Sequence, residues 1–140
     1  MKLVVIDGQG GKIGKLLIEK LKAASINAEI YAIGTNSIAT SVMMKAGADF
    51  AATGENPVIV NVRDADVIVG PIGIVIADAL LGEITPAMAG AIGQSRGEKV
   101  LLPINKCKNH VVGVKDATVS EIINEAVQYI LTLDKSACIG

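Results

Sequence analysis

Short apolar runs rich in β-branched residues recur along the chain and are separated by segments with helical spacing. Runs of this kind are typical of strands in a parallel sheet, where both faces are covered. We expect six strands, at residues 3–6, 28–33, 48–52, 66–70, 99–102 and 110–115. Helices are expected at residues 12–24, 37–45, 57–63, 74–81, 85–95 and from about 118 to 133.

The alternation of strands and helices predicts an α/β fold, a Rossmann-like, doubly wound, mostly parallel sheet of about six strands. If the strand order is 3-2-1-4-5-6, residues 8–14 and 70–73 flank the switch point of the sheet. We expect one domain over residues 1–140, with residues 134–140 as a loose tail. Several helices carry start signals: Thr35 or Asn36 before the second, Thr85 before Pro86, and Thr118 or Ser120 before the last.

Two segments are less clear in this pattern. Val58, Val60 and Val62 alternate as in a strand, whereas Asn56 followed by Pro57 is typical of a helix start, and we favour the helix. Residues 74–81 are apolar almost all round, which predicts a buried or interface helix that Gly82 ends. We therefore expect at least a dimer, with part of residues 74–88 in its interface.

The composition supports an oligomer and argues against several kinds of partner. Hydrophobic residues make up 51% of the chain, aromatic residues only 2%, and the mean hydropathy is +0.51. The longest charge-free apolar stretch, residues 67–77, is shorter than the ~20 residues of a membrane-spanning helix. The net charge of −1, with no basic cluster, argues against nucleic acid. The first strand starts at the N-terminus with no signal peptide, and Cys107 and Cys138 form no disulfide framework, so we expect a cytoplasmic protein.

The glycine turn, residues 8–14, lies between the first strand and the first helix. Glycines allow a tight bend and a close approach to a ligand, and the helix start offers free N–H groups at its positive end. This arrangement predicts a site for a phosphate. The alternative is a turn that only packs a helix on a sheet.

Gly8, Gly11 and Gly14 match the spacing GxxGxxG. The turn resembles that of extended short-chain dehydrogenases and of the dihydrodipicolinate reductase family, which implies a nicotinamide nucleotide. The P-loop pattern fails because Ile13 follows Lys12.

Over the whole chain, a second resemblance rests on residues 7–11, 34–36, 52–56, 70–74 and 102–105. These segments resemble an uncharacterised bacterial family of short Rossmann-like proteins, domain of unknown function family 3842. The resemblance implies the fold and brings no activity.

The segments that follow the expected strands meet at the carboxyl edge of a parallel sheet, where ligands bind. Glu55 and Asn56 offer polar groups there, although loops are polar for other reasons too. The residues expected to bind the ligand are Gly8, Gln9, Gly10, Gly11, Lys12, Ile13, Gly34, Thr35, Asn36, Gly70, Pro71, Ile72, Gly73 and Asn105.

The sequence identifies no catalytic group and no metal site. A tyrosine with a lysine four residues on is absent, because Thr35 follows Tyr31 and Leu133 follows Tyr129 at that spacing. Cys107 and the lone His110 supply two metal ligands, where a site needs three or four.

These patterns leave three functions open: a module that binds or senses a nucleotide or other phosphate-bearing ligand, a small NAD(P)-dependent oxidoreductase completed across a subunit interface, and a structural subunit without ligand. We favour the first. No acidic residue follows the second strand, so NADP is expected to bind at least as tightly as NAD. Gly11→Asp is expected to abolish binding and leave the fold intact.

Overall fold

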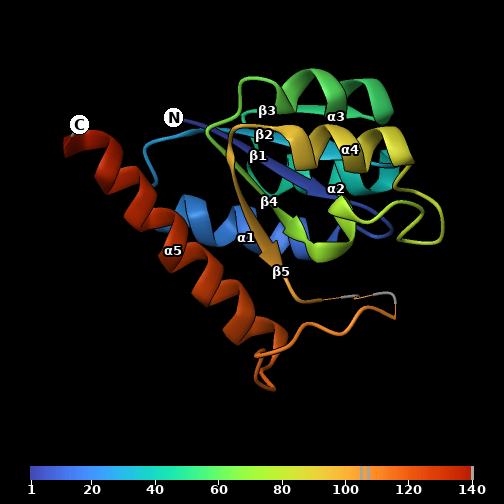
Figure 1. The fold of residues 1–140 in the computed structure, drawn as a ribbon. Coiled ribbons are helices and arrows are strands. Elements are labelled where there is room, and N and C mark those ends of the chain that lie inside the picture. Colours follow the sequence, from blue (N-terminus) through green and yellow to red (C-terminus); the bar gives the residue numbers. More distant parts are fainter. Residues whose placement is uncertain (105, 107, 140) are drawn as a thin grey trace.

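Five parallel strands form the sheet of the computed structural model, which describes residues 1–104, 106 and 108–139. The order is β3-β2-β1-β4-β5, and each neighbouring pair is parallel (Figure 1). The strands are β1 (Lys2–Asp7), β2 (Glu29–Gly34), β3 (Phe50–Thr53), β4 (Val67–Pro71) and β5 (Glu98–Leu102). The doubly wound fold is confirmed, with its switch point between β1 and β4.

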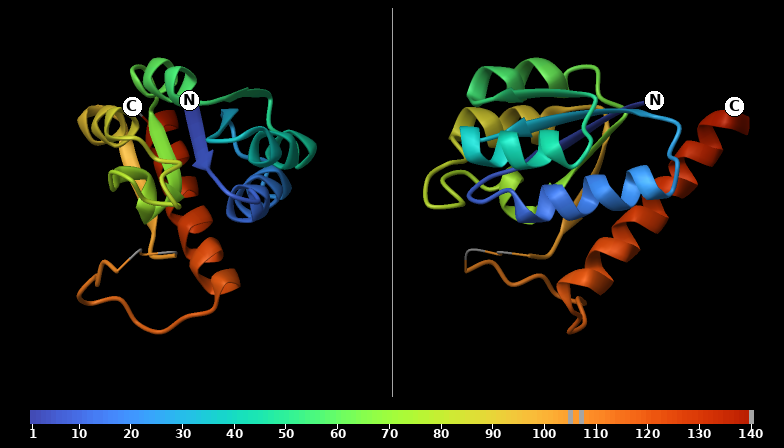
Figure 2. Two further views of the ribbon diagram at one scale, coloured as in Figure 1. Left: turned by 90° about the vertical axis from the view of Figure 1, so that its right-hand side faces the viewer. Right: turned by 180° about the vertical axis from the view of Figure 1, so that it is seen from behind.

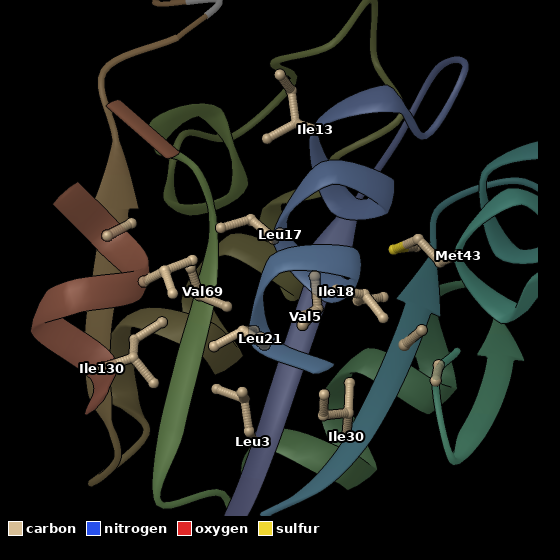
Figure 3. Close-up of a cluster of buried hydrophobic side chains, with 14 of the residues drawn as sticks. Leu3, Val5, Ile13, Leu17, Ile18, Leu21, Ile30, Met43, Val69 and Ile130 are labelled. Carbon is tan, nitrogen blue, oxygen red and sulfur yellow. The ribbon is translucent and has the colours of Figure 1, made fainter. Parts of the chain in front are cut away.

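Helices cover both faces of this sheet (Figure 2). They are α1 (Lys12–Ala23), α2 (Ser37–Lys45), α3 (Glu55–Val62), α4 (Pro86–Gln94) and α5 (Val119–Ile139), with the 3-10 turn η1 (Ile72–Val75). On one face, Leu17 of α1, Met43 of α2 and Ile130 of α5 share a core with Val5 (Figure 3). On the other face, α3 and α4 form a second core against β1 and β4. Within the described part of the chain, no helix is long and apolar enough to span a membrane.

Local capping signals place most helix starts correctly. The side chain of Asn36 accepts a hydrogen bond from the N–H of Ala39 at 2.9 Å, and the hydroxyl of Thr85 accepts one from the N–H of Met88 at 3.1 Å. At the start of α5, Thr118 accepts the N–H of Glu121 at 3.2 Å. The third helix is confirmed as a helix, but it begins at Glu55 after Gly54 rather than at Pro57.

The helix expected over residues 74–81 is wrong. After the single turn of η1, the chain continues as a loop to α4. Ile74 and Ile84 are 0% exposed and Leu80 is 3% exposed, all in the core under α3 and α4. These apolar residues anchor a loop onto their own chain, so they no longer give a reason to place residues 74–88 in a subunit interface.

Two expectations for the C-terminal part are also wrong. Residues 110–115 form no strand, because Gly113 turns the chain at φ +89° and the segment lies outside the sheet (Figure 1). The chain expected to loosen at residue 134 stays helical to Ile139, since no glycine or proline interrupts α5.

The loop between η1 and α4 has a run of unusual backbone angles. Asp78 has φ +66°, Leu80 and Leu81 have φ +56°, and Gly82 has φ +87°. This left-handed region suits glycine and asparagine but is strained for leucine. Leu81 is also 96% exposed, so its side chain gains nothing from packing in return.

We expect Leu81→Asn to raise the free energy of unfolding by about 1 kcal/mol, because asparagine adopts this backbone conformation with less strain. Leu80→Asn at the same φ is the control: it buries an amide in the core and is expected to destabilise by about 2–4 kcal/mol. Urea denaturation of both variants measures the difference. A loss of stability in Leu81→Asn would contradict the strain.

Candidate functional site

Asp7, the last residue of β1, holds the glycine turn in place. Its side chain is 5% exposed. Oδ1 accepts the N–H of Gly8 and Oδ2 accepts that of Gly14, both at 2.8 Å. The carboxyl group therefore satisfies a donor in the first turn of α1 and ties this helix to the end of β1.

Burial raises the pKa of Asp7 above the ordinary value of 3.8. The N–H groups of Gly14, Gly8 and Ile13 act in the opposite direction, and the nearby Glu83 carboxylate adds to the increase. Removal from water dominates because it penalises the charged form.

Most glycines of the turn are required by close packing. A Cβ on Gly14 would lie 2.3 Å from Met43 Sδ, and one on Gly11 would lie 2.8 Å from Ala39 Cα. Gly11 also has φ +73°. Gly11→Asp would therefore disturb the contact between α1 and α2, so the expectation that it leaves the fold intact is wrong.

Gly10 differs from these glycines. A Cβ built on it meets nothing within 4 Å, and its φ is not positive. Among the described residues, the N–H groups of Gly10 and Lys12 have no protein acceptor. The turn thus keeps two free donors at the positive end of α1.

These donors border a pocket of about 440 Å³ between the start of α1 and the start of α5. Its polar side chains are those of Lys12, Lys20, Ser120, Asp7 and Gln9, and Leu16 is among its apolar ones. The expected ligand residues in its lining are Gly8, Gln9, Gly10, Gly11, Lys12 and Ile13. This wall combines cationic and apolar groups.

The other expected site residues lie elsewhere. Gly70 lets β4 approach β1, because a Cβ there would lie 2.3 Å from the Ile6 carbonyl oxygen. Pro71, Ile72 and Gly73 continue into η1 and are not part of the described pocket wall. Asn105 and Cys107 are outside the described residues.

Residues 34–36 lie beside the turn, at the end of β2. Gly34 packs against Thr40, while Thr35 and Asn36 bind Glu83 from the loop between η1 and α4. Glu55 is also engaged, accepting the hydroxyl hydrogen of Thr85 at 2.5 Å, whereas Asn56 is exposed.

Comparison with known proteins places the sequence in a family. The model of the domain of unknown function DUF3842 matches residues 2–135. The chain belongs to this family.

The DUF3842 chain also resembles a solved structure, described as a dodecameric FMN-dependent UbiX-like decarboxylase from Escherichia coli O157:H7. The two share 17% identity with a TM-score of 0.46, over 95% of this chain and 94% of the other. No curated protein matches the sequence.

Glu83 is the functional candidate of the DUF3842 chain that the sequence did not reveal. Its Oε1 accepts hydrogen bonds from the N–H of Gln9, the hydroxyl of Thr35 and the amide of Asn36. Partial burial acts to raise the pKa of Glu83, but these three bonds outweigh it and lower the pKa. No acidic residue follows β2 in the sequence, as expected, and the carboxylate at the end of this strand comes from the distant Glu83.

The far wall of the pocket was also missed. Val119, Ser120 and Ile123 come from α5, which returns to pack against α1. A site of this kind is visible only once the topology is known. Among the described residues, no group of three His, Cys, Asp or Glu side chains is arranged to hold a metal ion.

We expect the carboxyl group of Asp7 to titrate above 3.8, the value of an unperturbed aspartate. An acid whose pKa rises on folding contributes stability below its unfolded pKa, and this stability is lost as pH rises through the folded pKa. Asp7→Asn should therefore lose more stability relative to wild type at about pH 3 than at about pH 7. Carboxyl-carbon NMR gives the midpoint directly.

Asp64 provides an internal reference in the same titration. Its hydrogen bond to Lys2 lowers the pKa of this exposed carboxylate below 3.8. A midpoint for Asp7 at or below that of Asp64 would show that the backbone hydrogen bonds, and not burial, dominate at the turn.

Proposed function

We propose that the chain binds a nucleotide or another phosphate-bearing ligand at the glycine turn. The main support comes from Gly10. Packing does not require a glycine at this position, and the missing side chain leaves the backbone accessible beside the free N–H groups of Gly10 and Lys12. A phosphate oxygen is the acceptor that such donors at a helix start prefer.

The pocket beside these donors supports the same proposal. Lys12 and Lys20 provide positive charge, and Ser120 provides a hydroxyl. Its volume, about 440 Å³, lies in the range of small-molecule sites. Because positive charge and a hydroxyl beside free N–H groups are suited to holding an anion, we propose binding or sensing as the function.

The carboxyl group of the neighbouring Asp7 is already engaged within the turn. Its two oxygens accept the N–H groups of Gly8 and Gly14, so these two donors are not available to a ligand. The free donors are those of Gly10 and Lys12, two residues that line the pocket.

We also propose a homo-oligomer, on different evidence from the apolar loop. Val112 is 86% exposed, Phe50 on the edge strand β3 is 48% exposed, and neither β3 nor β5 pairs with a further strand among the described residues. Unpaired edges with apolar side chains favour association.

We expect Gly10→Asp to abolish binding of phosphate ligands and to leave the melting temperature unchanged. The new carboxylate enters open space where the phosphate is proposed to lie. A thermal-shift panel of NAD, NADP, ATP, GTP, coenzyme A and FMN measures binding. A ligand at about 100 times its dissociation constant adds about 2.7 kcal/mol to wild type.

Gly90→Asp is the matched control, because Gly90 lies on α4 with open space around it and away from the pocket. It should retain every stabilisation seen with wild type. If no phosphate compound stabilises the wild-type protein, the proposed function is wrong.

For the oligomer, light scattering of the eluted protein should give a mass above the 14.4 kDa of one chain. Val112→Asp is expected to lower that mass or weaken the assembly, because it places a charge on the most exposed valine of the 110–115 segment. A single species of one-chain mass at micromolar concentration contradicts the proposal.

A further inference from the structure

The carboxylate of Glu83 is held over the glycine turn by one of its two oxygens. Oε1 accepts three hydrogen bonds, at 2.9 Å from the Gln9 N–H, 2.5 Å from the Thr35 hydroxyl and 2.8 Å from the Asn36 amide. Oε2 has no partner among the described residues. One oxygen thus fixes the orientation and the other remains free to accept.

Packing and a backbone hydrogen bond on either side of Glu83 fix the position of its carboxylate. Leu80 and Ile84 are buried on either side of it, and the N–H of Asp78 donates to the Ile84 carbonyl at 2.7 Å. The strained left-handed angles at Asp78, Leu80 and Leu81 lie in the same loop. Local strain of this kind is often found where a chain positions a functional group.

Gly8 completes the arrangement. A Cβ at this position would lie 2.5 Å from the Thr35 hydroxyl and 2.9 Å from Glu83 Oε1. The absence of a side chain on Gly8 is therefore what allows the carboxylate to reach the turn.

Fold stability gives little reason for this arrangement. Gln9 is exposed, and Thr35 and Asn36 are only partly buried, so water can serve the same donors. A ligand that donates to the free Oε2 of Glu83 explains the position of this carboxylate better than fold stability does.

We infer that Glu83 accepts hydrogen bonds from the vicinal ribose hydroxyls of the bound nucleotide and disfavours a phosphate ester at the 2′ position. This inference rests on the proposed function. In open parallel sheets with a glycine turn after β1, the ribose lies at the end of β2, where a carboxylate accepts its hydroxyls. Here Thr35 and Asn36 mark the end of β2, and the loop between η1 and α4 supplies the carboxylate.

Gln9 connects this position to the proposed phosphate site. Its N–H donates to Glu83, and the residue also lines the pocket next to Gly10. A nucleotide can therefore place its phosphate over Gly10 and its ribose beside Glu83 across one peptide unit. This assignment reverses the expectation that NADP binds at least as tightly as NAD.

The test is calorimetric titration of NAD and NADP, and of ADP and 2′-deoxyADP, into wild type, Glu83→Gln and Asp78→Asn. Wild type is expected to bind NAD about tenfold or more tightly than NADP, since like charges repel at the 2′ position. Glu83→Gln keeps an oxygen for the three donors but loses the charge, and should reduce this ratio to about twofold or less. ADP should bind more tightly than 2′-deoxyADP to wild type.

Asp78→Asn is the matched control. It removes one negative charge from the same loop, at a residue that tolerates φ +66° as asparagine and has no side-chain contact with Gln9, Thr35 or Asn36. It should keep the wild-type preference for NAD.

The outcomes separate the two proposals. If none of the four compounds binds wild type, the proposed function fails and the inference with it. If the compounds bind but NADP binds as tightly as NAD, Glu83 does not contact the ribose hydroxyls. The same holds if Glu83→Gln keeps the wild-type ratio of NAD to NADP affinity. In either case the proposed phosphate site is retained without the ribose contact. The wild-type comparison of ADP with 2′-deoxyADP decides the hydroxyl contact even if Glu83→Gln does not fold.

Discussion

The hydrogen bonds of the Asp7 carboxyl group are the constraint on which the rest of the site depends. They join the end of β1 to the Gly8 and Gly14 N–H groups and so fix where α1 begins. With α1 in that position, Gly14 packs against Met43 and Gly11 against Ala39, which brings α2 alongside. Burial raises the pKa of Asp7, while the N–H groups that the carboxyl group accepts to order the turn act to lower it.

The sequence predicted those parts of the fold that depend on neighbouring residues. β-Branched runs mark strands that are buried on both faces, and Asn36, Thr85 and Thr118 cap helices through N–H groups three residues away. Two of the three failures have tertiary causes. Residues 74–81 are apolar because a loop is anchored in the core, and residues 110–115 have strand-like residues but no strand beside them.

The candidate site also has a part that depends on neighbouring residues and a part that depends on tertiary contacts. Residues 8–13 are contiguous, so their part of the pocket wall could be predicted from one motif. Glu83 could not, because it lies 48 residues after Thr35, in the connection that follows the helix expected over residues 74–81. The α5 wall depends on the final helix returning to pack against α1, and neither spacing nor composition determines that contact.

A glycine-rich turn can be interpreted only when the glycines that packing requires are separated from those it does not. Gly8, Gly11 and Gly14 each have a neighbour that would collide with a Cβ, so they would be glycines in a turn without any ligand. Gly10 has no such neighbour, and it is the position where the backbone donors remain free. The carboxyl groups of Asp7 and Glu83 occupy the N–H groups of Gly8, Gly14 and Gln9. The free donors are therefore those of Gly10 and Lys12, with the Glu83 carboxylate on the adjacent N–H of Gln9 and with Lys12 and Lys20 in the pocket lining. In the proposed function, this arrangement of charges, rather than the number of glycines, sets the ligand preference of the turn.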